Sequence, residues 1–312
     1  MERAQGRRIT WEALPLHVRQ AVEDRLGSPV VEARNQQGGF SPGLAARLRA
    51  ANGERIFLKA SSPDLNPHTP HIHRQEARIA RALPAHAPVS RLLWDYDEGE
   101  TGWVALAFAD IEGHLPAHPW KREELERVVA AIAEMHATLT PCPIEIPSAG
   151  ERIAQALHGW ARLRGDTPGL DAWSCQHLGT LAALEREAPE AAAGDTLLHL
   201  DLRADNILLA GEEVVIVDWP GASVGAAWID MLGMAPSIAL EGGPDPAEFF
   251  FMHPASRAAE PDRVNAVLAA FAGFFTFHAL QPPPPGLPTL RAFQSAQGAE
   301  ARRWLAERSG LV

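Results

Sequence analysis

Residues 197–219, read as LLHLDLRADNILLAGEEVVIVDW, constrain the fold more than any other stretch. Two branched apolar runs, ILL and VVIV, flank the segment GEE, and this pattern predicts two short antiparallel strands joined by a tight turn. Asp201 and Asn206 precede the first run, and Asp218 follows the second. Antiparallel pairing would bring these three side chains to one end of the hairpin, where we expect chemistry. Asp and Asn also cap ordinary turns, so this interpretation needs support from elsewhere.

Length and composition predict a soluble globular protein. With 312 residues, 46% of them apolar and 21% charged, the chain is long enough for two lobes with separate cores. Its first residues have no apolar run typical of a secretory signal, and the apolar stretch 264–280 is too short and polar for a bilayer span. Cys142 and Cys175 form no disulfide framework or zinc motif. We therefore expect a cytoplasmic protein without a membrane partner, whose oligomeric state stays open.

Charge is distributed unevenly along the chain. Residues 1–109 carry a net charge of +2 and residues 110–312 a net charge of −13, with histidine neutral. This acidic excess argues against a nucleic-acid partner, because binding to a phosphate backbone needs clustered Lys and Arg. It would suit a cationic ligand, although an acidic surface can equally serve solubility alone. Candidate carboxylates for such a ligand are Glu241, Asp245, Glu248, Glu260 and Asp262.

The N-terminal third is predicted to contain a leading helix and then a five-stranded antiparallel sheet with one further helix. Residues 10–27 carry an apolar stripe at helical spacing that ends at Gly27. Short apolar runs separated by turn residues predict the strands. The strands are expected over residues 30–35, 44–50, 54–60, 89–96 and 102–108, and the second helix over residues 74–83.

A glycine-bearing loop, residues 36–43, joins the first two expected strands. Gly38, Gly39, Phe40 and Ser41 could let backbone amides approach a phosphate closely, because glycine has no Cβ in the way. The same residue types also form ordinary hairpin loops. We therefore treat the loop as a weak indication of phosphate binding.

Lys59 gives a sharper indication, since only two of the 28 basic residues are lysine. A lysine kept inside an apolar strand indicates a need for a compact ammonium, which fits between phosphate oxygens where a guanidinium would not. The alternative is a strand-edge lysine that points to solvent. Glu76 is expected in the first turn of the helix that follows, where a carboxylate also suits the helix dipole.

After the segment ADIEG, residues 109–113, the sequence pattern is mainly helical. Helices are expected over residues 121–139, 151–164, 171–187, 226–240, 261–280 and 289–308. The predicted fold class is therefore α+β, with an N-terminal lobe of residues 1–109, a linker of residues 109–113 and a larger, mainly helical C-terminal lobe of residues 110–312.

The order of these features resembles that of the protein-kinase-like fold, from about residue 30 onward. More specifically, the chain is similar to the aminoglycoside phosphotransferase family of small-molecule kinases, which includes antibiotic kinases and relatives acting on choline or homoserine. The resemblance implies a bilobal fold with a nucleotide, ATP or GTP, held between the lobes. The features that carry it are the glycine-bearing hairpin, Lys59, Glu76, the linker ADIEG, His199, Asp201, Asn206 and Asp218.

The resemblance also implies roles for individual residues. Asp201 would accept the proton of an acceptor hydroxyl, while Asn206 and Asp218 would hold Mg²⁺ on the phosphates. Lys59, positioned by Glu76, would bind the α and β phosphates.

Further roles follow for the nucleotide base and for the loop that carries Asp201. Adenine would lie against the backbone of Ala109 and Ile111, with Phe108 at the back of its pocket. Asp230 would brace the catalytic loop.

Two departures from related patterns bear on the substrate. Asp218 is followed by Trp219-Pro220 rather than Phe-Gly, and no Ala-Pro-Glu follows at activation-loop distance, which disfavours a peptide substrate. Arg203 stands where antibiotic kinases often have a histidine. The loop still has every residue that catalysis needs.

The sequence therefore predicts transfer of the γ-phosphate of ATP or GTP to a hydroxyl of a small molecule. The acidic C-terminal part slightly favours a cationic acceptor such as an aminoglycoside. The stretch Phe249-Phe250-Phe251-Met252, with Trp228 nearby, could instead line a pocket for a neutral or flat acceptor, as in a metabolite kinase of the choline or homoserine type. A non-catalytic, nucleotide-binding pseudokinase is the remaining alternative.

Overall fold

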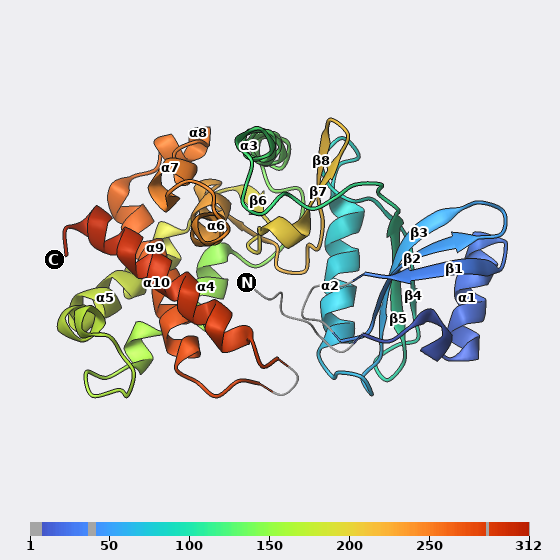
Figure 1. Cartoon of the computed structure of the whole chain (residues 1–312), viewed down its shortest axis with the longest axis horizontal. Helices are drawn as coiled ribbons and strands as arrows, with labels where there is room; N and C mark the ends of the chain where they lie inside the picture. The colour runs from blue at the N-terminus through green and yellow to red at the C-terminus, as the bar shows by residue number, and fades with distance from the viewer. Residues whose placement is uncertain (1–7, 37–41, 285–286, 312) are drawn as a thin grey trace.

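A computed structural model describes residues 8–36, 42–284 and 287–311. These residues form a five-stranded antiparallel sheet flanked by helices, followed by a larger and mainly helical region with two small two-stranded sheets (Figure 1). The predicted α+β fold class, with its antiparallel sheet first and its helices afterwards, is confirmed.

The five-stranded sheet has Lys59 on its central strand. The strand order is β1-β2-β3-β5-β4, and Lys59 on β3 lies opposite Ala45 of β2 and Leu106 of β5. Side chains alternate between the two faces of the sheet, so Ile56 and Leu58 point into one core while Lys59 points to the opposite face. The strands are β1 (Val30–Asn35), β2 (Leu44–Ala50), β3 (Arg55–Ser61), β4 (Leu92–Asp97) and β5 (Val104–Ala109).

The fourth strand begins later than the predicted residue 89. Val89 instead forms an isolated parallel bridge with Ile216, and the N–H of Ser90 donates to the Ile216 carbonyl at 3.2 Å. These contacts hold the segment before β4 against the hairpin of residues 207–216, which carries the site residues.

The leading helix is shorter than the predicted range of residues 10–27. A 3₁₀ turn, η1 (Trp11–Ala13), comes first, and α1 (Leu16–Leu26) follows. Pro15 is extended, at φ −54° and ψ 146°, and stands at the N-cap instead of inside the helix. The helix ends at Gly27, which adopts φ 66° as predicted for a C-terminal glycine. Figure 1 shows α1 on the face of the sheet that is turned away from the helical region.

The second helix, α2 (Thr69–Ala82), begins five residues before the predicted start at residue 74. Asn66 Oδ1 accepts hydrogen bonds from the N–H groups of His68 and Thr69, at 2.9 and 3.0 Å, and Pro70 occupies the first turn. The expectation that Glu76 lies in the first turn is therefore wrong, because it lies in the middle of the helix. α2 packs on the sheet face that is turned toward the helical region (Figure 1).

The helical region follows the predicted pattern, except that one predicted helix is shorter and the two short helices over residues 246–250 and 254–257 were not predicted. The predicted helix over residues 151–164 ends at Ala156, and Gly159 then packs so closely against α9 that a Cβ there would lie 1.9 Å from the Gly273 carbonyl oxygen. The described helices are α3 (Arg122–Thr138), α4 (Ala149–Ala156), α5 (Ala172–Ala191), α6 (Trp228–Leu240), α7 (Pro246–Phe250), α8 (Pro254–Arg257), α9 (Pro261–Ala279) and α10 (Leu290–Ser309), with a 3₁₀ turn η2 (Trp160–Arg162). Within the described part of the chain, no helix is long and apolar enough to traverse a lipid bilayer.

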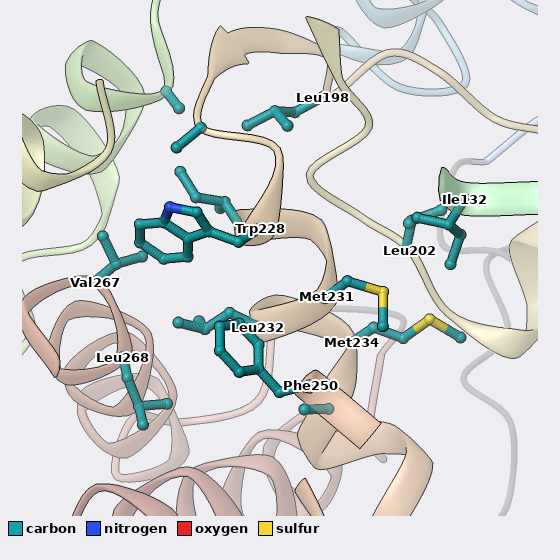
Figure 2. Close-up of a cluster of buried hydrophobic side chains, with 14 of the residues drawn as sticks. Ile132, Leu198, Leu202, Trp228, Met231, Leu232, Met234, Phe250, Val267 and Leu268 are labelled. Carbon is teal, nitrogen blue, oxygen red and sulfur yellow. The ribbon is translucent and has the colours of Figure 1, made fainter. Parts of the chain in front are cut away.

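The core of the helical region surrounds α6. Figure 2 shows Trp228 and Leu232 of α6 beside Val267 of α9 and Phe250 of α7, while Met231 lies toward the loop that follows β6 (Thr196–Leu198). The idea that residues 249–252 line a pocket together with Trp228 is wrong. Phe249 and Phe250 are fully buried in this core, and Trp228 is nearly so.

The neighbouring residues Phe250 and Phe251 provide a matched test of this core. Phe250 is fully buried, whereas Phe251 is 44% exposed. Phe250→Ala should lower the free energy of unfolding by about 3–5 kcal/mol, because it leaves a cavity among α6, α7 and α10. Phe251→Ala should cost less than about 1 kcal/mol. Chemical denaturation measures both, and equal losses would contradict this packing.

Candidate active site

The hairpin brings the three predicted polar residues to one end. Strands β7 (Ile207–Ala210) and β8 (Glu213–Ile216) pair antiparallel, with Ile207 opposite Ile216. Beyond that pair, the N–H of Val217 donates to the Asn206 carbonyl at 3.0 Å. The Asn206 amide nitrogen donates in turn to the backbone carbonyl of Asp201 at 2.8 Å. Asp201, Asn206 and Asp218 therefore lie together, as the sequence pattern indicates.

Lys59 joins this group from the sheet. Its Nζ lies 2.7 Å from Glu76 Oε1 and 2.7 Å from Asp218 Oδ1. Burial alone would lower the pKa of Lys59, but the carboxylates of Asp218 and Glu76 outweigh it and raise the pKa above its ordinary value. Lys59 is therefore a buried ammonium that connects α2 to the hairpin, and the alternative of a solvent-pointing lysine is wrong.

Asp230 of α6 anchors the loop of residues 199–206, called here the Asp201 loop. Its Oδ2 accepts a hydrogen bond from the His199 N–H at 2.9 Å, and its Oδ1 accepts one from the Leu200 N–H at 2.7 Å. Leu200 has φ 62°, a left-handed conformation that is costly for a residue other than glycine. These two hydrogen bonds hold the strained backbone immediately before Asp201.

Two histidines extend the anchor behind Asp230. His253 Nδ1 accepts from the Ala255 N–H at 3.1 Å, so in the neutral ring Nε2 carries the proton. That N–H donates to His136 Nδ1 at 3.3 Å, and His136 Nε2 donates to Asp230 Oδ2 at 3.0 Å. Sequence reasoning missed both histidines. Their sequence context resembles that of any buried side chain, and only the fold shows that they meet.

His199 connects the Asp201 loop to the hairpin. Its Nδ1 accepts from the Asp201 N–H at 3.2 Å, and its Nε2 donates to the Val217 carbonyl at 3.0 Å. Its ring contacts Trp219 edge to face, with 4.8 Å between centroids. The histidine two residues before Asp201 thus fixes the spacing between that loop and Asp218.

A cavity of about 370 Å³ lies between the sheet and the hairpin and is called here the nucleotide-side cavity. Its lining includes Lys59, Glu76, Phe108, Ala109, Ile111, Asn206 and Asp218 from the predicted set. The N–H of Ala109 already donates to the Arg91 carbonyl at 2.9 Å, whereas that of Ile111 has no acceptor among the described residues. Gly38, Gly39, Phe40 and Ser41 lie outside the described residues.

Two arginines of this cavity were not anticipated. Arg8 lines it from the N-terminal segment, where its backbone forms a bridge with Gly43. Arg47 also lines it and forms an ion pair with Asp110 at 2.5 Å. Nothing in the sequence distinguishes these arginines from the many others, so the fold was needed to find them.

A second cavity, of about 470 Å³, lies on the other side of the Asp201 loop and is called here the acceptor-side cavity. Leu200, Asp201 and Arg203 line it, whereas Asn206 and Asp218 line the nucleotide-side cavity. Different residues of this loop therefore line the two cavities, and Asp201 belongs to the lining of the acceptor-side cavity.

The five candidate carboxylates for a cationic ligand line neither cavity. Glu241 accepts a hydrogen bond from Trp120 Nε1 at 3.0 Å, and Asp245 forms an ion pair with Arg303 at 2.9 Å. Glu248, Glu260 and Asp262 are exposed on the outer surface. These five carboxylates therefore do not lie at the two cavities, although residues 110–312 carry a strongly negative net charge.

The donor set beside the hairpin fits a magnesium ion. The amide nitrogen of Asn206 is held by Asp201, which leaves its Oδ1 available, and Asp218 uses only Oδ1 for its ion pair with Lys59. Mg²⁺ prefers oxygen ligands and commonly takes one or two side chains together with substrate phosphates. Asn206 and Asp218 are thus the residues that could hold it.

Comparisons with known proteins show the family and the fold of the chain. A family model described as the phosphotransferase enzyme family matches residues 38–264. An aminoglycoside phosphotransferase, solved as a ternary complex with AMP-PNP and hygromycin B, has a similar structure, with a TM-score of 0.62 at 12% identity. That alignment covers 95% of this chain and 99% of the other.

Two further solved structures share the fold. A choline kinase from Streptococcus pneumoniae gives a TM-score of 0.59 at 11% identity, covering 94% of this chain and 98% of its own. An amicoumacin kinase in complex with AMP-PNP, Ca²⁺ and Ami gives 0.57 at 12% identity, covering 93% of both chains. No curated protein sequence matches significantly.

The histidine chain behind Asp230 predicts a pH dependence of stability. Burial and the neighbouring His136 lower the pKa of His253 to about 4. Between pH 6.5 and 4 the unfolded chain binds a proton at this position and the folded chain does not, so stability falls as pH falls. His253→Asn keeps an N-cap for Ala255 and should reduce this slope by up to about 1.4 kcal/mol per pH unit.

Urea unfolding of both proteins at several pH values checks this prediction. Other titrating groups contribute to both slopes, so the difference isolates His253. Equal slopes for the two proteins would mean that His253 accepts its proton equally well in the folded state.

Proposed function

The chain belongs to the phosphotransferase enzyme family, and on that premise we propose that it is a kinase transferring the γ-phosphate of ATP to a hydroxyl of a small molecule. One observation supports this most strongly: different residues of the Asp201 loop line the nucleotide-side cavity and the acceptor-side cavity. A phosphate entering from one side and a hydroxyl from the other would meet beside Asp201. Positioning of this kind supplies much of the catalysis in phosphoryl transfer.

In the proposed reaction the acceptor oxygen forms a bond to the γ-phosphorus. The bond from that phosphorus to the β–γ bridging oxygen breaks, and ADP leaves. Asp201 takes the proton of the hydroxyl, and its 53% exposed side chain is accessible for this step. Lys59, positioned by Glu76, would bind the α and β phosphates as a compact cation.

Mg²⁺ held by Asn206 and Asp218 would neutralise negative charge on the phosphates. Oδ2 of Asp218 and Oδ1 of Asn206 support this assignment, because both are oxygen atoms that form no hydrogen bond within the described part of the chain. Lys59 and the ion would then act on the same phosphates.

We favour ATP over GTP as the donor. The Ile111 N–H and the Ala109 carbonyl provide a donor and an acceptor for the edge of an adenine, which presents a ring nitrogen and an amino group. Phe108 lines the same cavity. The similar aminoglycoside phosphotransferase and amicoumacin kinase were both solved with AMP-PNP, an ATP analogue.

We assign the sheet, up to residue 109, to a nucleotide-binding lobe and residues 110–312 to an acceptor-binding lobe, with residues 109–113 as the linker. Asp110 supports a linker held firmly to the sheet, because it forms ion pairs with Arg47 at 2.5 Å and Arg55 at 2.8 Å. The acceptors named for the similar structures differ, so the acceptor class is argued from the cavity itself.

Asp201→Asn should leave ATP affinity within about threefold of wild type while phosphate transfer falls by about a hundredfold or more, because the proton acceptor is lost. The matched control is Asp195→Asn, an exposed carboxylate a few residues earlier. Transfer from labelled ATP to a panel of aminoglycosides, choline, homoserine and aromatic hydroxy acids provides the readout.

Unchanged transfer by Asp201→Asn would remove Asp201 from the mechanism. If the wild type binds ATP but transfers phosphate to no hydroxyl compound, the pseudokinase alternative would replace the proposed function.

A further inference from the structure

The acceptor-side cavity is walled mainly by apolar and aromatic side chains. Four half-buried phenylalanine rings come from α9 and α10, and several leucine and isoleucine side chains complete the walls. Concave surfaces of this kind bind flat apolar ligands, because stacking on the rings replaces contact with water. The aromatic residues are Phe271, Phe274, Phe275 and Phe293.

The carboxylates of this cavity are already engaged. Among its described lining residues they are Asp201 and Asp230. Asp230 accepts hydrogen bonds from two backbone N–H groups and from His136. Asp201 lies 3.6 Å from the guanidinium of Arg203, which also forms hydrogen bonds with Asp205. A polycationic ligand would therefore find no group of free carboxylates here.

Arg152 lines the acceptor-side cavity, and its guanidinium has no carboxylate partner among the described residues. It lies on α4, and its Nη2 donates to the backbone carbonyl of Ala222 at 3.2 Å. Its Nε is buried without an acceptor, and among the described residues no carboxylate lies within ion-pair distance of it. A partly buried guanidinium of this kind is costly unless a ligand completes its hydrogen bonds.

Gln297 adds a second unsatisfied group to the same cavity. Its amide nitrogen donates to Ser237 Oγ at 2.8 Å, which leaves Oε1 as a free acceptor. The side chain is only 2% exposed and its oxygen is enclosed, so Gln297 is an unpaired polar group in the wall of the cavity.

We propose that the acceptor is a flat, mainly apolar hydroxyl compound that carries one anionic group, such as a carboxylate, bound by Arg152. This inference rests on the proposed kinase function and names its substrate class. The aromatic walls hold the flat part of the molecule. A polycation is disfavoured, because it would approach Arg152 and Arg203 in an apolar setting.

Binding to chemically matched ligands tests this class. The probes are aromatic alcohols of one to three rings, each prepared with a carboxylate, a carboxamide or an aminomethyl group, and hygromycin B serves as the polycation. Ligand-observed NMR titration in the presence of AMP-PNP gives the affinities. Wild type should bind the carboxylate forms about ten- to a hundredfold more tightly than the carboxamide forms, because charge-assisted hydrogen bonds are stronger.

Arg152→Gln should remove this preference while changing the carboxamide affinity by less than about threefold. Arg186→Gln is the matched control, since Arg186 also donates to one backbone carbonyl, that of Ala182, but lines neither cavity. It should keep the full preference. An unchanged carboxamide affinity also shows that Arg152→Gln is folded.

The inference is overturned if aminomethyl forms or hygromycin B bind as tightly as the carboxylates, if no carboxylate binds, or if Arg152→Gln keeps the preference. Transfer from labelled ATP to the same compounds tests the proposed function separately. Carboxylates that bind through Arg152 but receive no phosphate would refute the kinase and keep the ligand class. If hygromycin B alone were phosphorylated efficiently, the kinase function would stand and the proposed ligand class would be overturned.

Discussion

The ion pairs of Lys59 are the interaction on which the geometry of the site depends. One ammonium, 15% exposed, contacts Glu76 of α2 and Asp218 after β8, although Lys59 and Asp218 lie 159 residues apart in sequence. Removing the ammonium would leave two carboxylates facing each other in a partly buried space, which is strongly unfavourable. The sheet and the hairpin are thus held in the arrangement that places a phosphate-binding cation beside the proposed metal ligands.

A second set of contacts fixes the Asp201 loop from the opposite side. Asp230 holds the strained backbone at Leu200, and His136 and His253 extend that support into the core around α6. Figure 2 shows Leu202 of this loop on the same side of α6 as Met231 and Met234. Burial of apolar side chains therefore stabilises the position of the loop as well as the helices. Two independent sets of contacts therefore fix the site residues on either side of the Asp201 loop.

Local patterns in the sequence were sufficient for much of the fold. The short apolar runs located Lys59 within a strand, and the branched runs on both sides of GEE located the hairpin. Asp201, Asn206 and Asp218 could be grouped because antiparallel pairing is a local consequence of that hairpin. Helix ends were less certain, because apolar periodicity does not show where a helix begins. Asn66 sets the start of α2 through hydrogen bonds, and the extended backbone of Pro15 sets the start of α1.

Two features that depend on distant contacts were not predicted. The meeting of His136 with His253, and the lining of the nucleotide-side cavity by Arg8, join segments far apart in the chain. Net charge could not show which charged residues face the cavities, for the same reason. The acidic excess is a property of composition, whereas the cavity walls are aromatic and include Arg152. Which side chains face a cavity is decided by tertiary packing.

Calorimetric titration of ATP with and without Mg²⁺, on wild type and Asp218→Ala, tests the central claim most directly. We expect Mg²⁺ to strengthen ATP binding to wild type markedly, because the ion bridges the phosphates and the Asp218 carboxylate. In Asp218→Ala that dependence on Mg²⁺ should disappear. An equal effect of Mg²⁺ on both proteins would show that the ion is held elsewhere, and would contradict the assignment of the hairpin as the phosphate-transfer site.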